Sequence, residues 1–328
     1  MPETFKTGAG TQTDNLWKMI GSTPLIAIRY TYRGSEEREL LVKCEQYNLT
    51  HSIKDRVVLY TLQRAKYEGQ LKPGDLIADA CSGNSGISLA AIGRALGHRV
   101  KIIMPDCTGM ETRAAVKGHG AELLLIGAAD GGFEACVKTA EAMSFHDGVF
   151  LPRKLTIACN VEAHERTTGR EIGHYLLLER IKPDAFVAGV GTGGTLLGVG
   201  KYLTAMYPDV ALYPVWAVEG NEHRISGYCQ VEKAVHNMKN WVEISDGDAI
   251  LMAQKLARSA GLPVGISSGA NFLGAVKVQQ QAGGKNVVLT IFPDHGNNYP
   301  ALLQTESIKD GYLSQEIELL GYKVLEKV

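Results

Sequence analysis

A glycine-rich turn in the second half of the chain constrains the fold more than any other stretch. Residues 189–198, Gly-Val-Gly-Thr-Gly-Gly-Thr-Leu-Leu-Gly, follow an apolar run at 185–188 that predicts a buried strand, and residues 196–206 predict a helix. A strand, a glycine turn and a helix N-terminus form an anion site, because backbone N–H groups there approach the ligand unpaired. No lysine follows the glycines as in a nucleotide P-loop, so the phosphate of a bound cofactor suits the turn better. The alternative is a plain strand-to-helix turn.

Apolar strand-like runs alternate with helical patterns along nearly the whole chain, which predicts an α/β fold with parallel sheets. A length of 328 residues favours two domains. We place the boundary near Pro152, so that 47–149 form a smaller mobile domain, and 1–46 with 150–328 form a larger domain carrying the glycine turn. Each domain is predicted to be an open, mostly parallel twisted sheet with helices on both faces.

The expected strands are 23–28, 39–44, 76–80, 100–104, 122–126, 149–151, 185–189, 212–219 and 286–292. The expected helices are 54–68, 85–96, 111–118, 133–143, 163–178, 196–206, 248–260 and 271–281.

The composition narrows the classes of function. A net charge of −1 gives no support to nucleic-acid or membrane binding, and no run approaches the ~18 apolar residues of a membrane span. Residues 1–15 lack the apolar core of a signal peptide. The six cysteines are scattered, which argues against a zinc site or a disulfide framework and for a reducing cytoplasm. We therefore expect a cytoplasmic protein without a metal site.

A lysine in the first turn of a predicted helix is the second landmark. Lys54 lies in Thr-His-Ser-Ile-Lys-Asp-Arg (50–56), with Ser52 where an N-cap belongs. The helix dipole disfavours a cation there, so this lysine is a candidate for an uncharged amine that forms a Schiff base. A solvated lysine is the commoner interpretation of an isolated case. Asp55 and Arg56 are interpreted as structural residues that cap the helix and pair with neighbours.

A turn of small polar residues precedes the next predicted helix. Its sequence, Cys-Ser-Gly-Asn-Ser-Gly (81–86), offers N–H groups for a carboxylate, and Asn84 could donate a hydrogen bond to a ring oxygen. The alternative is a helix cap made by Ser82 or Asn84.

A second small-residue turn, Gly-Ile-Ser-Ser-Gly-Ala (265–270), also precedes a helix. Here Ser267 or Ser268 could be an N-cap or could contact a ring nitrogen. Ligands of open α/β sheets bind beyond the carboxyl ends of the strands. We therefore expect the glycine-rich turns to converge in one cleft.

Taken in order, these stretches resemble the fold-type II pyridoxal-phosphate enzymes of the cysteine synthase and cystathionine β-synthase group. The family patterns S-x-K-D-R, T-S-G-N-T-G, G-V-G-T-G-G-T and G-I-S-S-G-A match residues 52–56, 81–86, 189–195 and 265–270. Residues 20–25 look like I-G-N-T-P-L, and residues 164–171 look like H-x-x-T-G-x-E. The resemblance covers roughly residues 15–300, at the family's spacing.

The resemblance implies a role for each matched residue. Lys54 would carry pyridoxal phosphate and act as the catalytic base, Asn84 would bond the ring hydroxyl oxygen, and Ser267 would face the pyridine nitrogen. The phosphate would lie on Gly191, Thr192, Gly193, Gly194 and Thr195, with the active site in the cleft between the domains. A neutral serine makes the ring a weaker electron sink than a carboxylate would, which suits β-elimination better than transamination.

The implied activity is β-replacement on a serine-type amino acid (serine, cysteine, O-acetylserine or O-phosphoserine) through an aminoacrylate intermediate, with sulfide or a thiol as nucleophile. By resemblance alone we expect a homodimer, with a serine acetyltransferase as candidate partner. The expected substrate-binding residues are Cys81, Ser82, Ser85, Lys154 and Gly227.

Departures from the family pattern bear on the substrate. Cys81 replaces the usual threonine and supplies only a weak S–H donor. Lys154 takes the place of the glutamine that touches the substrate carboxylate in the family. The entrance loop after Glu219 is short: residues 223–228 resemble H-K-I-Q-G-I, but the G-A-G-F that follows in the family is absent.

Other functions remain open at this point. Within the same fold, the alternatives are β-elimination releasing hydrogen sulfide or ammonia, and a synthase that uses an amine nucleophile to make a diaminopropionate derivative. A non-catalytic pyridoxal-phosphate-binding scaffold is a remote alternative. A nicotinamide oxidoreductase would use residues 189–194 as G-x-G-x-x-G, with Glu219 as the acidic residue, but it leaves the lysine motif unexplained.

Overall fold

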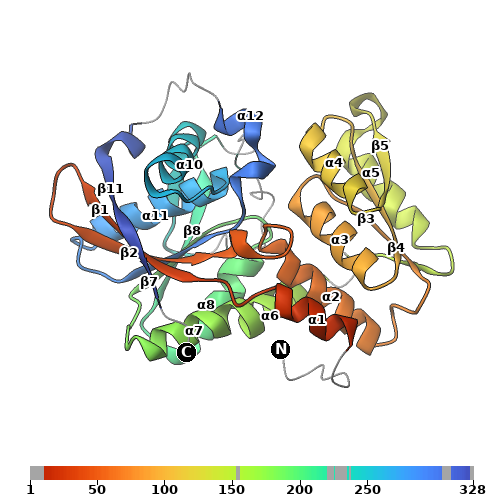
Figure 1. Ribbon diagram of the computed structural model, residues 1–328, viewed down its shortest axis with the longest axis horizontal. Helices are drawn as coiled ribbons and strands as arrows, with labels where there is room; N and C mark the ends of the chain where they lie inside the picture. Colours follow the sequence, from red (N-terminus) through yellow and green to blue (C-terminus); the bar gives the residue numbers. More distant parts are fainter. Residues whose placement is uncertain are drawn as a thin grey trace. The chain divides into compact units, whose positions relative to one another are not determined.

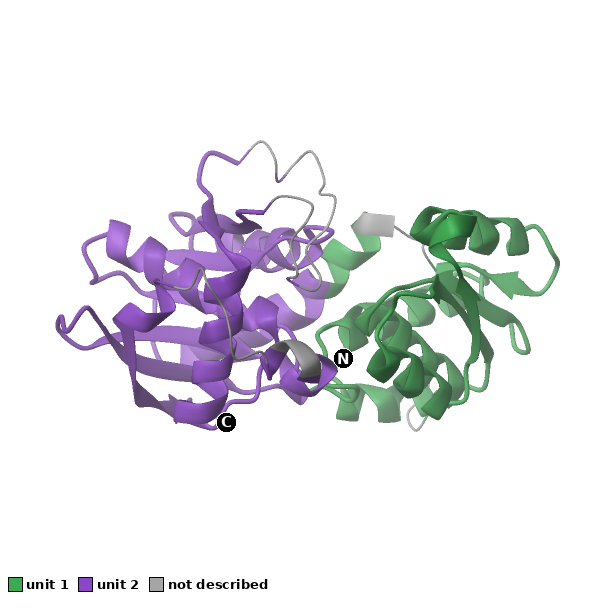
Figure 2. Ribbon diagram, turned by 90° about the horizontal axis from the view of Figure 1, so that it is seen from above, with its two compact units in different colours: residues 1–21, 48–163 green, residues 22–47, 164–328 purple. Residues whose placement is uncertain are grey.

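Two separate β-sheets divide the chain, one of four strands and one of seven. The computed structural model describes residues 11–152, 156–219, 225, 235, 238–304 and 312–325. By internal contacts, unit 1 comprises Met1–Gly21 with Asn48–Ala163, and unit 2 comprises Ser22–Tyr47 with His164–Val328 (Figure 2). These contacts group residues 1–21 and 150–163 with the smaller unit, whereas the boundaries drawn from the sequence assigned them to the larger one.

The sheet of unit 1 is parallel throughout, in the order β5–β4–β3–β6. The pleat of β4 (Arg99–Pro105) sends Val100 and Ile102 into one apolar core and Ile103 into the core on the other face. Helices α3 and α4 cover the first face, α2 packs against α3, and α5 covers the second face (Figure 1). The other elements are α1 (Gln12–Met19), α2 (Lys54–Tyr67), β3 (Leu76–Ala80), α3 (Asn84–Ala95), α4 (Met110–Gly118), β5 (Glu122–Ile126), η3 (Ala128–Asp130), α5 (Gly132–Met143), β6 (Val149–Phe150) and α6 (Thr156–His164).

The sheet of unit 2 has the order β11–β1–β2–β10–β7–β8–β9. Strands β2, β10, β7, β8 and β9 run parallel, and β1 is antiparallel to both of its neighbours. Helices α10 and α11 cover one face and α7 and α8 the other (Figure 1). Because both faces are covered, the interior strand β7 (Ala185–Gly189) is a continuous apolar run rather than an alternating one.

The other elements of unit 2 are β1 (Leu25–Tyr32), β2 (Arg38–Cys44), η2 (Glu45–Tyr47), η5 (Glu165–Gly169), α7 (Arg170–Leu178), α8 (Gly194–Met206), β8 (Ala211–Ala217), β9 (Val242–Ile244), α10 (Asp246–Ala260), α11 (Ile266–Gln281), β10 (Val288–Phe292), η7 (Gly296–Asn298), α12 (Pro300–Leu303), η8 (Ser314–Glu316) and β11 (Ile317–Val324).

The predicted fold class is confirmed: the chain is an α/β protein with two open, mostly parallel sheets. One predicted element is wrong. The single helix expected over 163–178 is the end of α6, then a π-helical turn at Glu165–Gly169, then α7. A π-turn inserts an extra residue into a helix, and such insertions occur frequently at functional sites.

Candidate active site

Lys54 is the first residue of α2 in unit 1 and is half-buried. Its backbone N–H donates to Ser52 Oγ over 3.2 Å. The N-cap position belongs to Ile53, which makes no side-chain cap, so the prediction of Ser52 as N-cap is wrong by one residue. The lysine stands at the end of a helix where the dipole favours an uncharged amine over an ammonium ion.

A buried carboxylate fixes the turn that precedes this lysine. Asp55 is fully buried and accepts hydrogen bonds from the backbone N–H of Thr50, over 2.6 Å, and from the Thr50 hydroxyl. The Thr50 hydroxyl also lies 3.2 Å from the buried Ser88 Oγ on α3. Between them, His51 adopts φ +62°, a conformation that non-glycine residues hold only where the surroundings impose it. Asp55 therefore ties the lysine-bearing turn to α3.

Asp55→Ala is expected to lower the free energy of unfolding by about 3 kcal/mol, because it leaves the buried Thr50 N–H without an acceptor and removes the hydrogen bond from the Thr50 hydroxyl. Asp55→Asn keeps one acceptor oxygen and is expected to lose about half as much. Urea unfolding of the three proteins measures both values. A loss below about 0.5 kcal/mol for Asp55→Ala would contradict this role.

The turn at 81–86 links β3 to α3 within the same unit. The backbone N–H of Cys81 donates to the Ile103 carbonyl over 3.0 Å, and its side chain is buried, whereas Ser82 is exposed. Asn84 is the first residue of α3, whose N-cap is Gly83 and has no side-chain cap. The alternative of a turn capped by Ser82 or Asn84 is therefore not the structure adopted. Lys54 and this turn lie in one unit and are linked through Thr50 and Ser88.

The glycine-rich turn of unit 2 follows β7 directly, as predicted. Gly193 is the N-cap of α8 and adopts φ +83°, where a side chain is strained. A Cβ atom at Gly193 would also lie 3.0 Å from Cγ2 of Val235. Gly193 has no side chain to cap α8, and the Gly194 N–H makes a long contact of 3.5 Å with Thr192 Oγ1. The first turn of a helix offers N–H groups to an anion, which is the role predicted for this turn.

Asn271, which sequence reasoning missed, anchors the start of this turn. The helix α11 begins at Ile266 rather than at the predicted residue 271, so Asn271 is an interior helical residue and is buried. Its Oδ1 accepts from the Gly189 N–H over 2.7 Å, and its Nδ2 donates to the Ile291 carbonyl over 2.8 Å. The sequence did contain a signal for Asn271. It is a polar residue four positions after Ser267, and residues four apart lie on the same face of a helix.

Ser267 lies in the first turn of α11 and is buried. Its hydroxyl donates to Oδ1 of the buried Asp294 over 3.4 Å, and the Tyr299 hydroxyl donates to the other carboxylate oxygen. The N-cap of α11 is Gly265, with no side-chain cap, so neither serine caps the helix. The turn does not follow a strand: the Gly265 N–H instead donates to the Asp294 carbonyl, just beyond β10.

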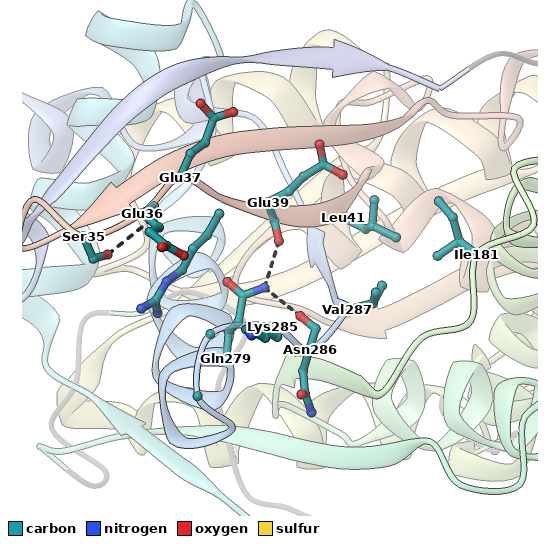
Figure 3. Close-up of a pocket in the computed structure, with 13 residues that line it drawn as sticks. Ser35, Glu36, Glu37, Glu39, Leu41, Ile181, Gln279, Lys285, Asn286 and Val287 are labelled. Carbon is teal, nitrogen blue, oxygen red and sulfur yellow. Dashed lines mark hydrogen bonds between the residues drawn. The ribbon is translucent and has the colours of Figure 1, made fainter.

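A pocket of about 610 Å³ in unit 2 lies away from these turns (Figure 3). It opens beside the first residues of β2 and β10, whereas the glycine-rich turn follows the last residue of β7, which runs parallel to both. The polar groups of Gln279 in its wall are engaged: the amide donates to the Glu39 and Asn286 carbonyls over 2.9 and 2.7 Å and accepts from the Tyr30 hydroxyl. This pocket therefore has no part in the site.

Each unit thus assembles one half of the predicted residues. Lys54, Asn84 and the carboxylate turn belong to unit 1, whereas residues 191–195 and Ser267 belong to unit 2. Lys154 and Gly227 lie outside the described residues. The convergence of both halves in one cleft stays a prediction.

Comparison with known proteins decides the family. The model of the family "Pyridoxal-phosphate dependent enzyme" matches residues 16–294. The chain belongs to the pyridoxal-phosphate-dependent enzymes, in the cysteine synthase family. A cysteine synthase of Staphylococcus aureus is 33% identical over 298 residues, which are 87% of this chain and 95% of that relative.

Solved structures support the same family. A hydrogen sulfide-producing enzyme from Fusobacterium nucleatum matches with a TM-score of 0.88 and 37% identity, over 95% of this chain and 99% of that one. A cysteine synthase from Entamoeba histolytica matches with a TM-score of 0.80 and 27% identity, over 95% and 96%. Family membership argues against two alternatives from the sequence, the nicotinamide oxidoreductase and the non-catalytic scaffold, because the matched family is described as pyridoxal-phosphate-dependent enzymes.

The described residues fit pyridoxal phosphate. The cofactor needs an amine for its aldehyde, donors for its phosphate and a partner for its ring nitrogen. Lys54, the first turn of α8 and the buried hydroxyl of Ser267 are the groups that would meet these needs. Within the described ranges, no three His, Cys, Asp or Glu side chains gather as metal ligands would, and no helix has the length and apolarity to cross a bilayer.

Proposed function

We propose that the chain catalyses β-replacement on a serine-type amino acid, with a sulfur group entering or leaving at Cβ. One observation supports the proposal above all others. The chain is a member of this family, and it has both a lysine at the start of α2 and a glycine-rich turn at the start of α8. We infer an amino-acid substrate because the relatives of this chain include a cysteine synthase, which the match covers over 95% of its length.

The residues of the chain divide the work. Pyridoxal phosphate, when bound, supplies the electron sink for the pair released at the substrate α-carbon. The Lys54 amine removes the α-proton and returns a proton at the end of the reaction. The N–H groups of residues 191–195 hold the phosphate, and those of the 81–86 turn hold the substrate carboxylate. Ser267 faces the ring nitrogen as a neutral group, and Asn84 orients the ring. Carboxylate contacts from Lys154 and Gly227 stay predictions, as do the homodimer, the serine acetyltransferase partner and the cytoplasmic location.

Release of hydrogen sulfide from cysteine is the second candidate. It is favoured by the match to the hydrogen sulfide-producing enzyme, whose TM-score of 0.88 and identity of 37% exceed the 0.80 and 27% of the Entamoeba cysteine synthase. In this direction the thiol leaves Cβ and another nucleophile, or none, takes its place. The two candidates use the same residues and differ in the groups that enter and leave.

A product assay separates the candidates. The holoenzyme is given O-acetylserine with sulfide in one experiment and cysteine alone in another, and cysteine, sulfide, serine and pyruvate are quantified. β-Replacement predicts cysteine from the first mixture, whereas the second candidate predicts sulfide from cysteine at a higher kcat/KM. If neither mixture, nor serine or O-phosphoserine in place of the donor, gives a β-substituted or β-eliminated product, the proposed function is wrong.

A further inference from the structure

The segment 164–171 matches a family pattern but has no role in the function proposed above. It comprises the last residue of α6, the π-helical turn Glu165–Gly169 and the start of α7. In Figure 1, α7 and α8 lie side by side on the same face of the unit 2 sheet. The segment therefore packs against the helix that begins at the phosphate turn.

A buried histidine connects this segment to the turn. His164 is 1% exposed, and its Nε2 lies 3.3 Å from Oγ1 of Thr195, the second residue of α8. Its other ring nitrogen, Nδ1, lies 2.9 Å from Oγ1 of the fully buried Thr168. An imidazole held at both nitrogens has a fixed ring orientation, and the tautomer follows from the direction of these hydrogen bonds.

Close packing fixes the distance between the two elements. Positions 169 and 173 are glycines that face Tyr202 of α8. A Cβ atom at Gly169 would lie 2.8 Å from the Tyr202 Cβ, and one at Gly173 would lie 2.4 Å from a Tyr202 ring carbon. The π-turn and α7 therefore approach α8 more closely than any side chain at these positions would permit.

The far end of the segment is held by an ion pair between a buried lysine and a partly buried glutamate. Glu171 lies 2.7 Å from Nζ of Lys43, whose side chain is fully buried, and also accepts the Ser22 N–H over 2.8 Å. Lys43 further donates to the carbonyl and the hydroxyl of Thr23. A rigid attachment of this kind keeps a positioning side chain in place without help from the ligand.

A phosphate beside Thr195 would select the direction of the hydrogen bonds. A phosphate dianion accepts hydrogen bonds and has no proton to donate. The Thr195 hydroxyl can therefore donate its single proton to the phosphate only if its oxygen accepts from His164 Nε2–H. A neutral ring must then carry its proton on Nε2 and accept from the Thr168 hydroxyl at Nδ1. The opposite tautomer would make Thr195 donate its single proton to His164 and leave none for the phosphate.

We propose that His164 is a positioning residue for cofactor binding: a hydrogen-bond chain from Thr168 through His164 to Thr195 orients the Thr195 hydroxyl as a donor to the cofactor phosphate. The inference rests on the proposed placement of the phosphate at residues 191–195. It assigns no proton transfer to His164 during the reaction.

The test measures binding to the apoenzyme rather than turnover. Dissociation constants for pyridoxal phosphate and for pyridoxal, which lacks the phosphate, are compared in the parent and in His164→Leu, His164→Gln and Thr168→Val. We expect His164→Leu to weaken pyridoxal phosphate about tenfold while pyridoxal changes by less than about twofold. Glutamine offers an amide donor near the position of Nε2, so His164→Gln is expected to recover most of the affinity, and Thr168→Val to show a smaller loss in the same direction.

A spectroscopic readout and a control separate positioning from folding. The ³¹P chemical shift of the bound cofactor is expected to move in His164→Leu and to return toward the parent value in His164→Gln. His98 is a matched control because it is also buried, in unit 1, with Nδ1 3.0 Å from the Asp75 carbonyl. His98→Leu is expected to lower stability and leave the ³¹P shift unchanged.

Equal losses of affinity for pyridoxal phosphate and pyridoxal, or an unchanged ³¹P shift in His164→Leu, would overturn the inference. The variant Gly193→Leu distinguishes this failure from failure of the proposed site. If Gly193→Leu loses the cofactor and His164→Leu does not, only the positioning role is wrong. If both bind it normally, the phosphate is not on this turn and both proposals fall.

Discussion

Lys54→Ala is expected to lower kcat/KM for the β-substituted donor by a factor of about 10³ or more, because one side chain both joins the cofactor and moves the α-proton, and proton transfer alone contributes about 10²–10⁴. The product assay with O-acetylserine and with cysteine measures the loss. Thermal unfolding of the variant is expected to stay near the parent value, because Lys54 is half-buried at a helix start rather than part of the core.

Lys66 provides the matched control for this substitution. It lies in the last turn of the same helix and is exposed. Lys66→Ala removes the same charge from α2 and is expected to retain activity within about twofold, because an exposed surface substitution costs little. Retention of most activity in Lys54→Ala would remove the lysine from the mechanism.

Gly193→Leu is expected to weaken pyridoxal phosphate binding by a factor of about 10² or more, since the change strains the backbone, crowds Val235 and displaces several N–H donors together. Residue 193 adopts φ +83°, and the Cβ atom of a leucine there would lie only 3.0 Å from Cγ2 of Val235. Titration of the apoenzyme with the cofactor, followed by absorbance, measures the change.

Gly261 separates backbone strain from loss of the phosphate turn. It lies in the same unit, at the C-cap of α10, and adopts φ +64° with no atom within 4 Å of the place that a Cβ atom would take. Gly261→Leu is expected to lower stability by about 1 kcal/mol and to bind the cofactor normally. Normal cofactor binding by Gly193→Leu would contradict the assignment of the phosphate turn.

The buried Asp294 changes how Ser267 is best examined. A Ser267→Asp variant would place a second carboxylate against the one that Ser267 now contacts at 3.4 Å, and two adjacent buried carboxylates disfavour double ionisation. A loss of activity in that variant could therefore come either from repulsion between the two carboxylates or from a change at the cofactor ring. Ser267→Ala removes the hydroxyl without adding charge and is the cleaner replacement.

The parallel core of each sheet was predictable because local patterns specify it. Strands β3 and β7 have the bounds 76–80 and 185–189 that the apolar runs indicate, and glycine turns or polar turns follow them. The same patterns located the glycine-rich turn before α8 and the lysine at the start of α2, because short apolar runs, glycine and helix starts are features of neighbouring residues.

The elements that were missed depend on distant partners. Strand β11 (Ile317–Val324) pairs with β1 at the edge of the sheet, and nothing within either segment specifies the other. The π-turn at Glu165–Gly169 contacts Tyr202 of α8 through Gly169, and helical periodicity within the segment does not indicate that partner. Likewise, the roles of Asn271 and Asp294 arise only when α11 folds against the ends of β7 and β10.

Reduction of the holoenzyme with borohydride, followed by peptide mapping, tests the central claim most directly. Borohydride fixes pyridoxal phosphate to the amine that holds it, and the absorption of the pyridoxyl group marks the modified peptide. The account predicts one labelled peptide, containing Lys54, and no label in Lys54→Ala. A label on another lysine, or a protein that takes up no cofactor after reconstitution, would contradict it.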